Sequence, residues 1–352
     1  MLRLNSISLS STNKILHIKA FMEPKKFQSA HVVKMLGLDI QPQSLLKAES
    51  VGRIPKAQRV KRGKVPTRFW TLQEIPDIAK VLGKLPRPSH CQVISTYVPK
   101  GGVGKSLWTF NFSRILALNG IKTLVIGSDF QCSISKSFGV SYEDDQEMPL
   151  SLYDVLVDGV NIEEVIWKSD IPTLHFIPEN TELTFIDRAI LRKTRKEYLL
   201  SKVIQPLKSK YDVIIIDCPP HWNELTTNAL IASNIIVSPV LADGESYHSF
   251  KIFMKELSNF LEDAETQFDL VKFIANGVDI RNKYTTSYQK KFLNDYPEVF
   301  SSIYIKDSVF LKEATELQMS IVEHKPKSSP AEDINAATYD IWTDILEASK
   351  EK

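Results

Sequence analysis

A glycine-rich loop between an apolar run and a helix constrains this chain more than any other feature. Residues 99–106 read Pro-Lys-Gly-Gly-Val-Gly-Lys-Ser, after the apolar run 93–98 and before a helical segment that reaches Leu118. Glycines let the backbone turn its N–H groups toward a phosphate, and the helix N-terminus adds positive potential. Lys105 would reach the β- and γ-phosphates and the Ser106 hydroxyl would ligate Mg²⁺. The loop predicts a nucleotide site; the alternative is a glycine turn with two chance lysines.

Short apolar runs set the fold class of the chain from Cys91 onward. They alternate with longer amphipathic segments, and the runs are 93–98, 123–127, 174–178, 213–217, 235–240 and 271–276. Apolar strands that alternate with helices form a mainly parallel sheet covered on both faces. We therefore predict an α/β fold, a mainly parallel sheet flanked by helices, whose ligands bind at the carboxyl ends of the strands.

Polar residues follow three of these runs, where the fold would place a ligand. Asp129 comes soon after the run 123–127, and a carboxylate there can hold a water in line or accept its proton; the alternative is a helix N-cap. Asp217 ends the run 213–217 as in a Walker B element and would hold Mg²⁺ through water. Asn276 ends the last run, where its amide suits either an adenine edge or a turn.

The phosphate loop carries a family resemblance. Its residues 100–106, with Lys100 ahead of the glycines and Pro99 where the ordinary pattern has glycine, resemble the deviant phosphate loop of the ParA/MinD family of ATPases, and the resemblance runs from about Cys91 to Ala348. In that family the extra lysine crosses an ATP-sandwiched dimer to the partner's phosphates. The resemblance implies the catalytic residues Lys100, Lys105 and Asp129, the Mg²⁺ ligands Ser106 and Asp217, and the nucleotide ligands Lys100, Gly101, Gly102, Val103, Gly104, Lys105, Ser106, Leu107 and Asn276.

The segment after the second run departs from the family pattern Asp-x-Asp-Pro-Gln. Residues 127–131 read Gly-Ser-Asp-Phe-Gln, so Asp129 and Gln131 match, while Gly127 replaces the first aspartate and Phe130 replaces the proline. In the family the residue that matches Asp129 orients the attacking water. The missing first carboxylate keeps open an alternative, a transcriptional regulator that binds ATP and hydrolyses little of it.

A basic block precedes the nucleotide-binding part. Residues 1–90 carry 17 Lys and Arg against 5 Asp and Glu, whereas the remaining residues carry 27 against 37. A basic block on an acidic body predicts a separate module that meets an anionic partner. We expect a flexible tail at 1–25, in which Met22 is a second candidate start, a DNA-binding domain at 26–88 and a ParA-type ATPase domain at 89–352.

The basic block also has the pattern of a helix-turn-helix. A short helix with Val32, Val33 and Leu36 inward ends at Gly37, a second helix covers 43–50, a basic wing or loop covers 53–68, and a third helix spans about 72–82. This order resembles the winged helix-turn-helix of MerR-like modules; the alternative is a generic small helical domain. Expected DNA contacts, including two in the ATPase part, are Gln43, Ser44, Arg53, Lys61, Arg62, Arg68, Arg281 and Lys283.

These features predict a DNA-partition ATPase for a plasmid or chromosome. By the resemblance, it binds ATP and Mg²⁺, forms a homodimer on ATP, binds DNA non-specifically, is stimulated by a ParB-type centromere-binding protein, and represses its own operon through the N-terminal module. No run of eighteen apolar residues and no leader-like N-terminus is present, so we expect a cytoplasmic, nucleoid-associated protein with no membrane contact.

Two further alternatives remain open on sequence grounds. A MinD-like positioning ATPase needs a C-terminal amphipathic membrane anchor, but residues 339–350 are acidic on their polar face. A nitrogenase-reductase-like iron–sulfur protein needs cysteines that bridge a cluster between subunits, and neither Cys132 nor Cys218 falls where such a ligand would.

Overall fold

The six apolar runs become six parallel strands of one sheet. The computed structural model describes residues 25–62, 65–142 and 148–350. The sheet has the strand order β5-β6-β4-β7-β3-β8-β9, and only the short edge strand β5 is antiparallel to its neighbour. The strands are β3 (Gln92–Thr96), β4 (Thr123–Gly127), β5 (Trp167–Lys168), β6 (Leu174–Ile177), β7 (Val213–Asp217), β8 (Ile235–Leu241) and β9 (Leu270–Asn276). The predicted mainly parallel sheet is confirmed; the edge strand β5 was not predicted.

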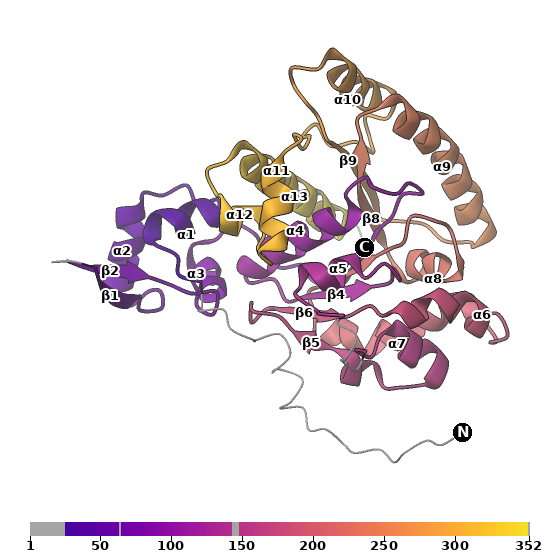
Figure 1. Cartoon of the computed structure of the whole chain (residues 1–352), viewed down its shortest axis with the longest axis horizontal. Coiled ribbons are helices and arrows are strands. Elements are labelled where there is room, and N and C mark those ends of the chain that lie inside the picture. Colours follow the sequence, from indigo (N-terminus) through magenta and orange to yellow (C-terminus); the bar gives the residue numbers. More distant parts are fainter. Residues whose placement is uncertain (1–24, 63–64, 143–147, 351–352) are drawn as a thin grey trace.

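Each strand contributes side chains to two cores because successive residues point to opposite faces of a sheet. Along β7, Val213 and Ile215 belong to one apolar cluster and Ile214 and Ile216 to the other. Helices α4 and α13 cover the first face, and α7, α8 and α9 cover the second (Figure 1). A strand that is apolar at every position is therefore buried on both faces, as expected for a parallel sheet.

The helices of this main body follow the strands in the expected alternation. The longest are α9 and α13. Their bounds are α4 (Lys105–Leu118), α5 (Ser133–Ser137), α6 (Ile186–Ile190), α7 (Leu199–Ile204), α8 (Glu224–Ala232), α9 (Gly244–Asp263), α10 (Lys283–Asp295), α11 (Val309–Glu316), α12 (Ile321–His324) and α13 (Ser329–Ala348). Short π- and 3₁₀-helical turns lie between β4 and β7.

The N-terminal residues fold in the order helix, turn, helix, hairpin, helix. These elements are α1 (Ser29–Met35), α2 (Pro42–Ser50), β1 (Gln58–Arg62), β2 (Val65–Phe69) and α3 (Ile75–Leu82). Helix α3 begins later than the predicted residue 72, because Thr71 donates to Glu74 Oε2 from its N and Oγ1, at 2.7 and 2.6 Å, in a preceding turn. The hairpin occupies the segment expected as a wing, and its residues 63–64, including Gly63, lie outside the described residues.

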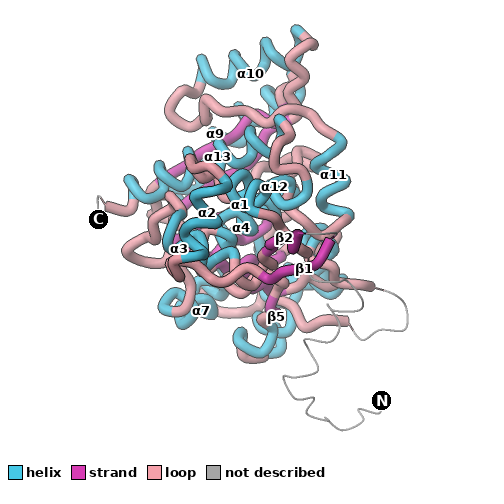
Figure 2. Tube along the Cα trace, turned by 90° about the vertical axis from the view of Figure 1, so that its left-hand side faces the viewer, coloured by secondary structure: helices cyan, strands magenta, loops and turns pink. Residues whose placement is uncertain are grey.

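This N-terminal module packs directly on the main body. Figures 1 and 2 show the module beside the main body, where α1 contacts α12 and α3 contacts α4. His31 Nε2 lies 2.8 Å from the carbonyl oxygen of Glu323, and Tyr339 donates its hydroxyl to the Leu36 carbonyl at 2.7 Å. Trp70 and Ile78 of the module share an apolar cluster with Trp342 of α13. The two parts therefore share one core.

Lys25 and the expected linker are also held by the main body. Residues 1–24 lie outside the described residues, but Lys25 Nζ donates to the carbonyls of Leu317 and Gln318 at 3.2 and 3.0 Å. In the expected linker, the Pro86 carbonyl accepts a hydrogen bond from Trp342 Nε1 at 2.9 Å. The division at residue 88 stays a prediction, and the chain on either side of it is packed rather than free.

Candidate nucleotide site

The glycine-rich loop lies at the carboxyl end of β3 and leads into α4. Gly104 is the N-cap of α4 with φ +94° and ψ +23°, a left-handed conformation that glycine adopts without strain. A Cβ at this position would lie 2.7 Å from Asn276 Nδ2. Asn276 in turn donates from Nδ2 to the Val103 carbonyl at 2.8 Å, so the end of β9 braces the loop. The adenine contact expected of Asn276 stays a prediction.

Lys105 is buried under this loop. Its side chain is 7% exposed, and Nζ donates to the Lys100 carbonyl at 2.7 Å and the Val98 carbonyl at 3.3 Å. Burial lowers the pKa of the Lys105 amine, and the nearby Asp217 carboxylate opposes that shift. A buried amine that is held only by carbonyls beside the positive end of a helix is a strong point of attraction for a phosphate.

Asp217 joins the loop to the neighbouring strand. It ends β7, opposite Thr96 of β3, and is fully buried. Its Oδ2 accepts from Ser106 Oγ at 2.6 Å and its Oδ1 from Thr109 Oγ1 at 2.8 Å. Burial raises the pKa of Asp217 to about 6. Thr109 was not predicted, although it lies three residues after Ser106 and hence on the same face of α4.

The Ser106–Asp217 pair has the chemistry that Mg²⁺ selects. A hydroxyl and a carboxylate are hard oxygen ligands, and Mg²⁺ usually keeps only one or two of these from a protein. Across the described ranges, no group of three or more His, Cys, Asp and Glu side chains is placed to hold a metal. A Mg²⁺ here would take its remaining ligands from phosphate and water.

Asp129 lies at the same sheet edge, after the next strand along. Gly127 of β4 pairs in register with Asp217, and Ser128 donates to the Asp217 carbonyl from N at 3.1 Å and from Oγ at 2.6 Å. The Asp129 side chain is 8% exposed and its Oδ1 accepts from Gln131 N at 3.0 Å. The carboxylate therefore lies in a turn, not at the N-cap of α5, which is Cys132.

A third carboxyl at this edge was missed. Glu179 follows β6, the neighbour of β4, and is fully buried. Its Oε1 accepts from Asp129 N at 3.1 Å. The signal was in the sequence: the run 174–178 is followed directly by this acid, just where ligand-binding residues were expected for the other strands.

Lys100 pairs with acids at the start of α9, whereas Lys105 donates to the carbonyls of Val98 and Lys100. Lys100 Nζ lies 3.3 Å from Glu245 Oε2 and 3.6 Å from Asp243 Oδ1, both at the start of α9. The Lys100 side chain is 17% exposed, whereas that of Glu245 is 84% exposed. Within one chain the predicted trans-acting lysine thus rests on a weak surface ion pair.

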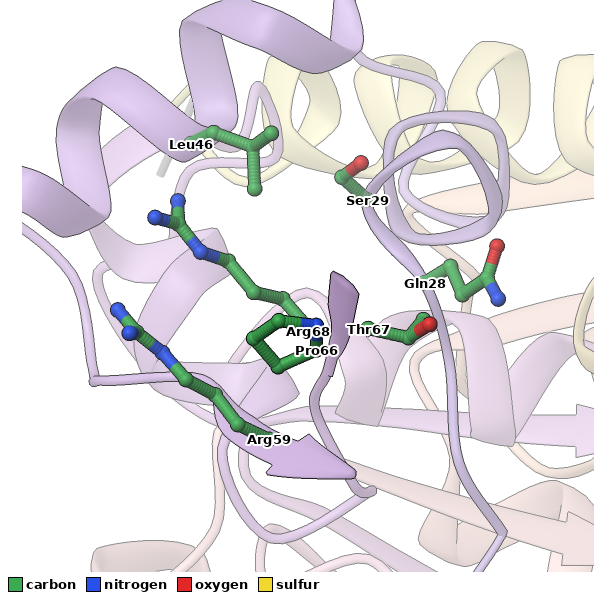
Figure 3. Close-up of a pocket in the computed structure, with 7 residues that line it drawn as sticks. All are labelled: Gln28, Ser29, Leu46, Arg59, Pro66, Thr67 and Arg68. Carbon is green, nitrogen blue, oxygen red and sulfur yellow. The ribbon is translucent and has the colours of Figure 1, made fainter. Parts of the chain in front are cut away.

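The predicted DNA contacts of the N-terminal module lie on α2, in the turn after it and in the hairpin. Gln43 and Ser44 are exposed at the start of α2, Arg53 is exposed in the turn after it, and Lys61 and Arg62 end β1. Figure 3 shows Arg59 and Arg68 side by side at an open hollow of about 460 Å³ between the hairpin and the helices. Arg68 also pairs with the buried Glu49, at 3.0 Å between Nη1 and Oε2.

The two candidates in the ATPase part lie elsewhere. Arg281 and Lys283 are exposed at the start of α10, and Arg281 Nε lies 3.1 Å from Asp279 Oδ1. Figure 1 shows α10 well apart from α1, α2 and the hairpin, so the eight candidates do not form one surface on a single chain.

The residues on which the iron–sulfur and the MinD-like alternatives depend are buried. Cys132 and Cys218 are 3% and 1% exposed, and burial raises their pKa values to about 11 and about 12, so neither presents a thiolate to a cluster between subunits. Ile341, Trp342 and Ile345 of α13 lie in the core, so this C-terminal helix has no free apolar face to insert in a membrane. In the part of the chain that is described, no helix is long and apolar enough to cross a bilayer.

Comparisons with known proteins agree with this geometry. A family model described as an AAA domain matches residues 91–270. The cell division protein PomZ of Myxococcus xanthus is 28% identical over 329 residues, which covers 93% of this chain and 96% of PomZ, so that match includes most of residues 1–90. The sporulation initiation inhibitor protein Soj of Bacillus subtilis is 27% identical over 244 residues, 68% of this chain and 94% of Soj. The structure of apo McdA from Cyanothece superposes with a TM-score of 0.63 at 18% identity, over 71% of this chain and 99% of McdA.

Proposed function

Since this chain belongs to the AAA domain family and is an ATPase of the ParA/MinD type, we propose that it hydrolyses Mg²⁺-bound ATP to partition or position a cargo on DNA. The observation that carries the proposal is the approach of Ser106 Oγ to Asp217 Oδ2, at 2.6 Å, beside the buried amine of Lys105. A hydroxyl, a carboxylate and a cation at the start of a helix are the groups that a Mg²⁺-bound triphosphate requires.

Each residue of this site has a defined task in the proposed reaction. Lys105 and the N–H groups of residues 101–106 hold the phosphates, Ser106 and Asp217 hold the cation, and Asp129 holds the attacking water in line. The Mg²⁺ ion, when bound, neutralises charge on the β- and γ-phosphates. Lys100 of a second copy adds a cation near the transferring phosphate, where it stabilises charge that grows in the transition state.

The proposed cycle depends on DNA and on a partner. The ATP dimer binds DNA non-specifically through basic residues such as Arg281 and Lys283, and a ParB-type protein stimulates hydrolysis and release. The test is ATP turnover measured with neither addition, with DNA, and with DNA plus the protein encoded beside this gene. We expect the highest turnover when DNA and the partner protein are both present. Absence of turnover under all three conditions would favour the regulator that binds ATP without hydrolysing it.

Replacement of Lys100 by alanine tests the trans-acting lysine. ATP binding by a single chain should persist, because Lys100 Nζ pairs with Asp243 and Glu245 of its own chain and Lys105 remains to bind the phosphates. Dimerisation on ATP and hydrolysis should both be lost. Sedimentation with a non-hydrolysable ATP analogue measures the first, and phosphate release measures the second.

Glu245→Ala is the matched control for this substitution. It removes the nearer of the two partners of Lys100 but keeps the cation, and an exposed ion pair contributes little to stability. The control should dimerise and hydrolyse ATP like the wild type. Normal dimerisation and turnover by the Lys100 variant would rule out the trans-acting role.

We further propose that the N-terminal module binds operator DNA and represses the operon. Arg59 and Arg68 are directly opposed in the β1–β2 register, and like charges so placed repel each other unless an anion lies between them. Glu49 pairs with Arg68 and leaves the charge of Arg59 without this neutralisation. A DNA phosphate at the hollow in Figure 3 would neutralise the exposed Arg59, while Gln43 and Ser44 at the start of α2 would reach base edges.

The salt dependence of DNA binding tests this assignment. Arg59→Ala should weaken binding to the upstream region of its own gene and reduce the slope of log affinity against log salt by about 1, as one phosphate contact is lost. Lys84→Ala, at an exposed position after α3, is the control and should leave the slope unchanged. An unaltered slope for Arg59→Ala would place the phosphate contacts outside the hollow.

A further inference from the structure

Gly127 and Glu179 share one small volume at the sheet edge. A Cβ built on Gly127 would lie 2.3 Å from Glu179 Cγ and 2.7 Å from Glu179 Cδ. Real Cβ atoms do not approach neighbours so closely, so any other residue at 127 would displace the Glu179 side chain. The glycine is thus needed for space: it leaves open the volume through which Glu179 reaches from β6 across the end of β4.

The Glu179 carboxyl holds the segment after β4 from both ends. Its Oε1 accepts from Asp129 N at 3.1 Å, and its Oε2 accepts from Ser135 N at 3.2 Å and from Ser135 Oγ at 3.1 Å. The backbone N of Glu179 donates back to Ser135 Oγ at 2.7 Å. Between these two anchors, Cys132 has a φ of +56°, a left-handed conformation that only a well-held backbone maintains for such a residue.

We infer that Glu179 is a positioning residue for hydrolysis: its carboxyl fixes the segment 129–135 so that Asp129 faces the phosphate site. This inference rests on the proposed role of Asp129 in orienting the attacking water. Glu179 itself is fully buried and lies behind that segment, so it acts through Asp129 and does not touch the nucleotide. A shift of the Asp129 carboxylate by about 1 Å is enough to impair such a step severely.

The cost of burying this carboxyl offsets part of what its hydrogen bonds contribute to the stability of the fold. Burial raises the pKa of Glu179 well above its ordinary value, and the charges of Asp217 and Asp129 raise it further. Placing an acid in such surroundings is unfavourable, and that cost opposes the contribution of its hydrogen bonds. A variant that lacks the carboxyl should therefore fold, which allows position and stability to be measured separately.

The first test compares Glu179→Ala, Glu179→Gln and Asp129→Ala with the wild type. For Glu179→Ala we expect kcat to fall about 10- to 100-fold while KM for ATP and the melting temperature stay close to wild type. Glu179→Gln keeps one acceptor oxygen but turns a donor toward Asp129 N or Ser135. Its kcat should therefore lie between those of Glu179→Ala and the wild type. Glu182→Gln, an exposed acid three residues further on, is the matched control and should behave as wild type.

The second test places a side chain at position 127 in the presence and in the absence of the Glu179 side chain. Gly127→Asp alone should lower the melting temperature, because the new side chain overlaps Glu179. Gly127→Asp combined with Glu179→Ala removes the overlap with Glu179 and should recover part of the lost melting temperature, while Ile134 Cγ2, at 2.9 Å from the same Cβ, still crowds the new side chain. If the double variant is no more stable than Gly127→Asp alone, the two side chains do not share a volume and the geometric basis of the inference is wrong.

The outcomes separate this inference from the role of Asp129. Wild-type kcat for Glu179→Ala, with Asp129→Ala inactive, would overturn the positioning role and leave the role of Asp129 intact. Wild-type kcat for Asp129→Ala would overturn the role of Asp129 first and the inference with it. A parallel loss of kcat, ATP affinity and melting temperature in Glu179→Ala would show a merely structural residue and also overturn the inference.

Discussion

Lys105→Ala is expected to abolish ATP binding, and with it dimerisation and hydrolysis. The Lys105 amine is the cation buried under the loop, held at 2.7 and 3.3 Å by the carbonyls of Lys100 and Val98. Its loss removes the charge-assisted hydrogen bonds to the β- and γ-phosphates; the Val98 carbonyl keeps the hydrogen bond that it accepts from Lys100 N at 2.8 Å. Each charged hydrogen bond contributes about 1.5–3 kcal/mol, so loss of two corresponds to an affinity lower by about 100-fold or more.

Isothermal titration with ATP and Mg²⁺ measures this affinity directly. Lys122→Ala is a suitable control, because Lys122 is exposed before β4, at the amino-terminal edge of the sheet away from the loop. A circular dichroism spectrum unchanged from the wild type shows that the Lys105 variant is folded. ATP binding at wild-type affinity by a folded Lys105→Ala protein would refute the assignment of residues 99–106 as the phosphate loop.

Much of the fold could be predicted because each central strand is buried on both faces. A run such as 213–217 is apolar at every position until its final acid, and few other structures give that pattern. The edge strand β5 has only two residues, Trp167 and Lys168, and carries no such signal. Its pairing with β6 depends on tertiary contacts that a single short segment does not reveal.

Two acids that end or follow apolar runs were predicted as site residues, whereas Glu179, which also follows a run, was missed. Asp129 and Asp217 each end or follow an apolar run, so their approach could be inferred from parallel topology alone. The close packing of Gly127 and Glu179 could not be inferred, because it depends on how the side chain after β6 packs against the end of β4. The sequence shows that position 127 has no carboxylate, but it does not show that the Glu179 side chain occupies the adjacent volume.

The N-terminal module was predicted from its charge and its helix-turn-helix pattern, and neither shows how the module packs on the main body. The 17 basic residues among residues 1–90 suggested a separable unit, but this count does not show which apolar side chains of the module face the main body. Trp70, Ile75 and Ile78 are fully buried in the cluster that also contains Trp342 of α13. A module with such a shared core is held much more firmly than a tethered DNA-binding arm.

Removal of residues 1–88 is therefore expected to destabilise the ATPase part, although it takes none of the predicted nucleotide ligands. The deletion removes α1 and α3, which lie against α12 and α4, and it removes the Pro86 carbonyl that accepts from Trp342. Each large apolar side chain that becomes exposed costs about 1.5–3 kcal/mol, and a whole domain is stable by only about 5–15 kcal/mol. Exposure of a few such side chains on α4 and α13 would leave the truncated protein largely unfolded or aggregated.

Thermal unfolding of three proteins tests this expectation: the full chain, residues 89–352, and a deletion of residues 1–24, most of the segment that the sequence predicts to be a flexible tail. The short deletion should melt like the full chain, while residues 89–352 should show a much lower melting temperature or no soluble product. Arg59→Ala in the full chain separates the two properties of the module, since it removes a charge without touching the shared core and should lose operator affinity while keeping full stability. Residues 89–352 that melt and hydrolyse ATP like the full chain would instead establish the separable module that the charge pattern predicts.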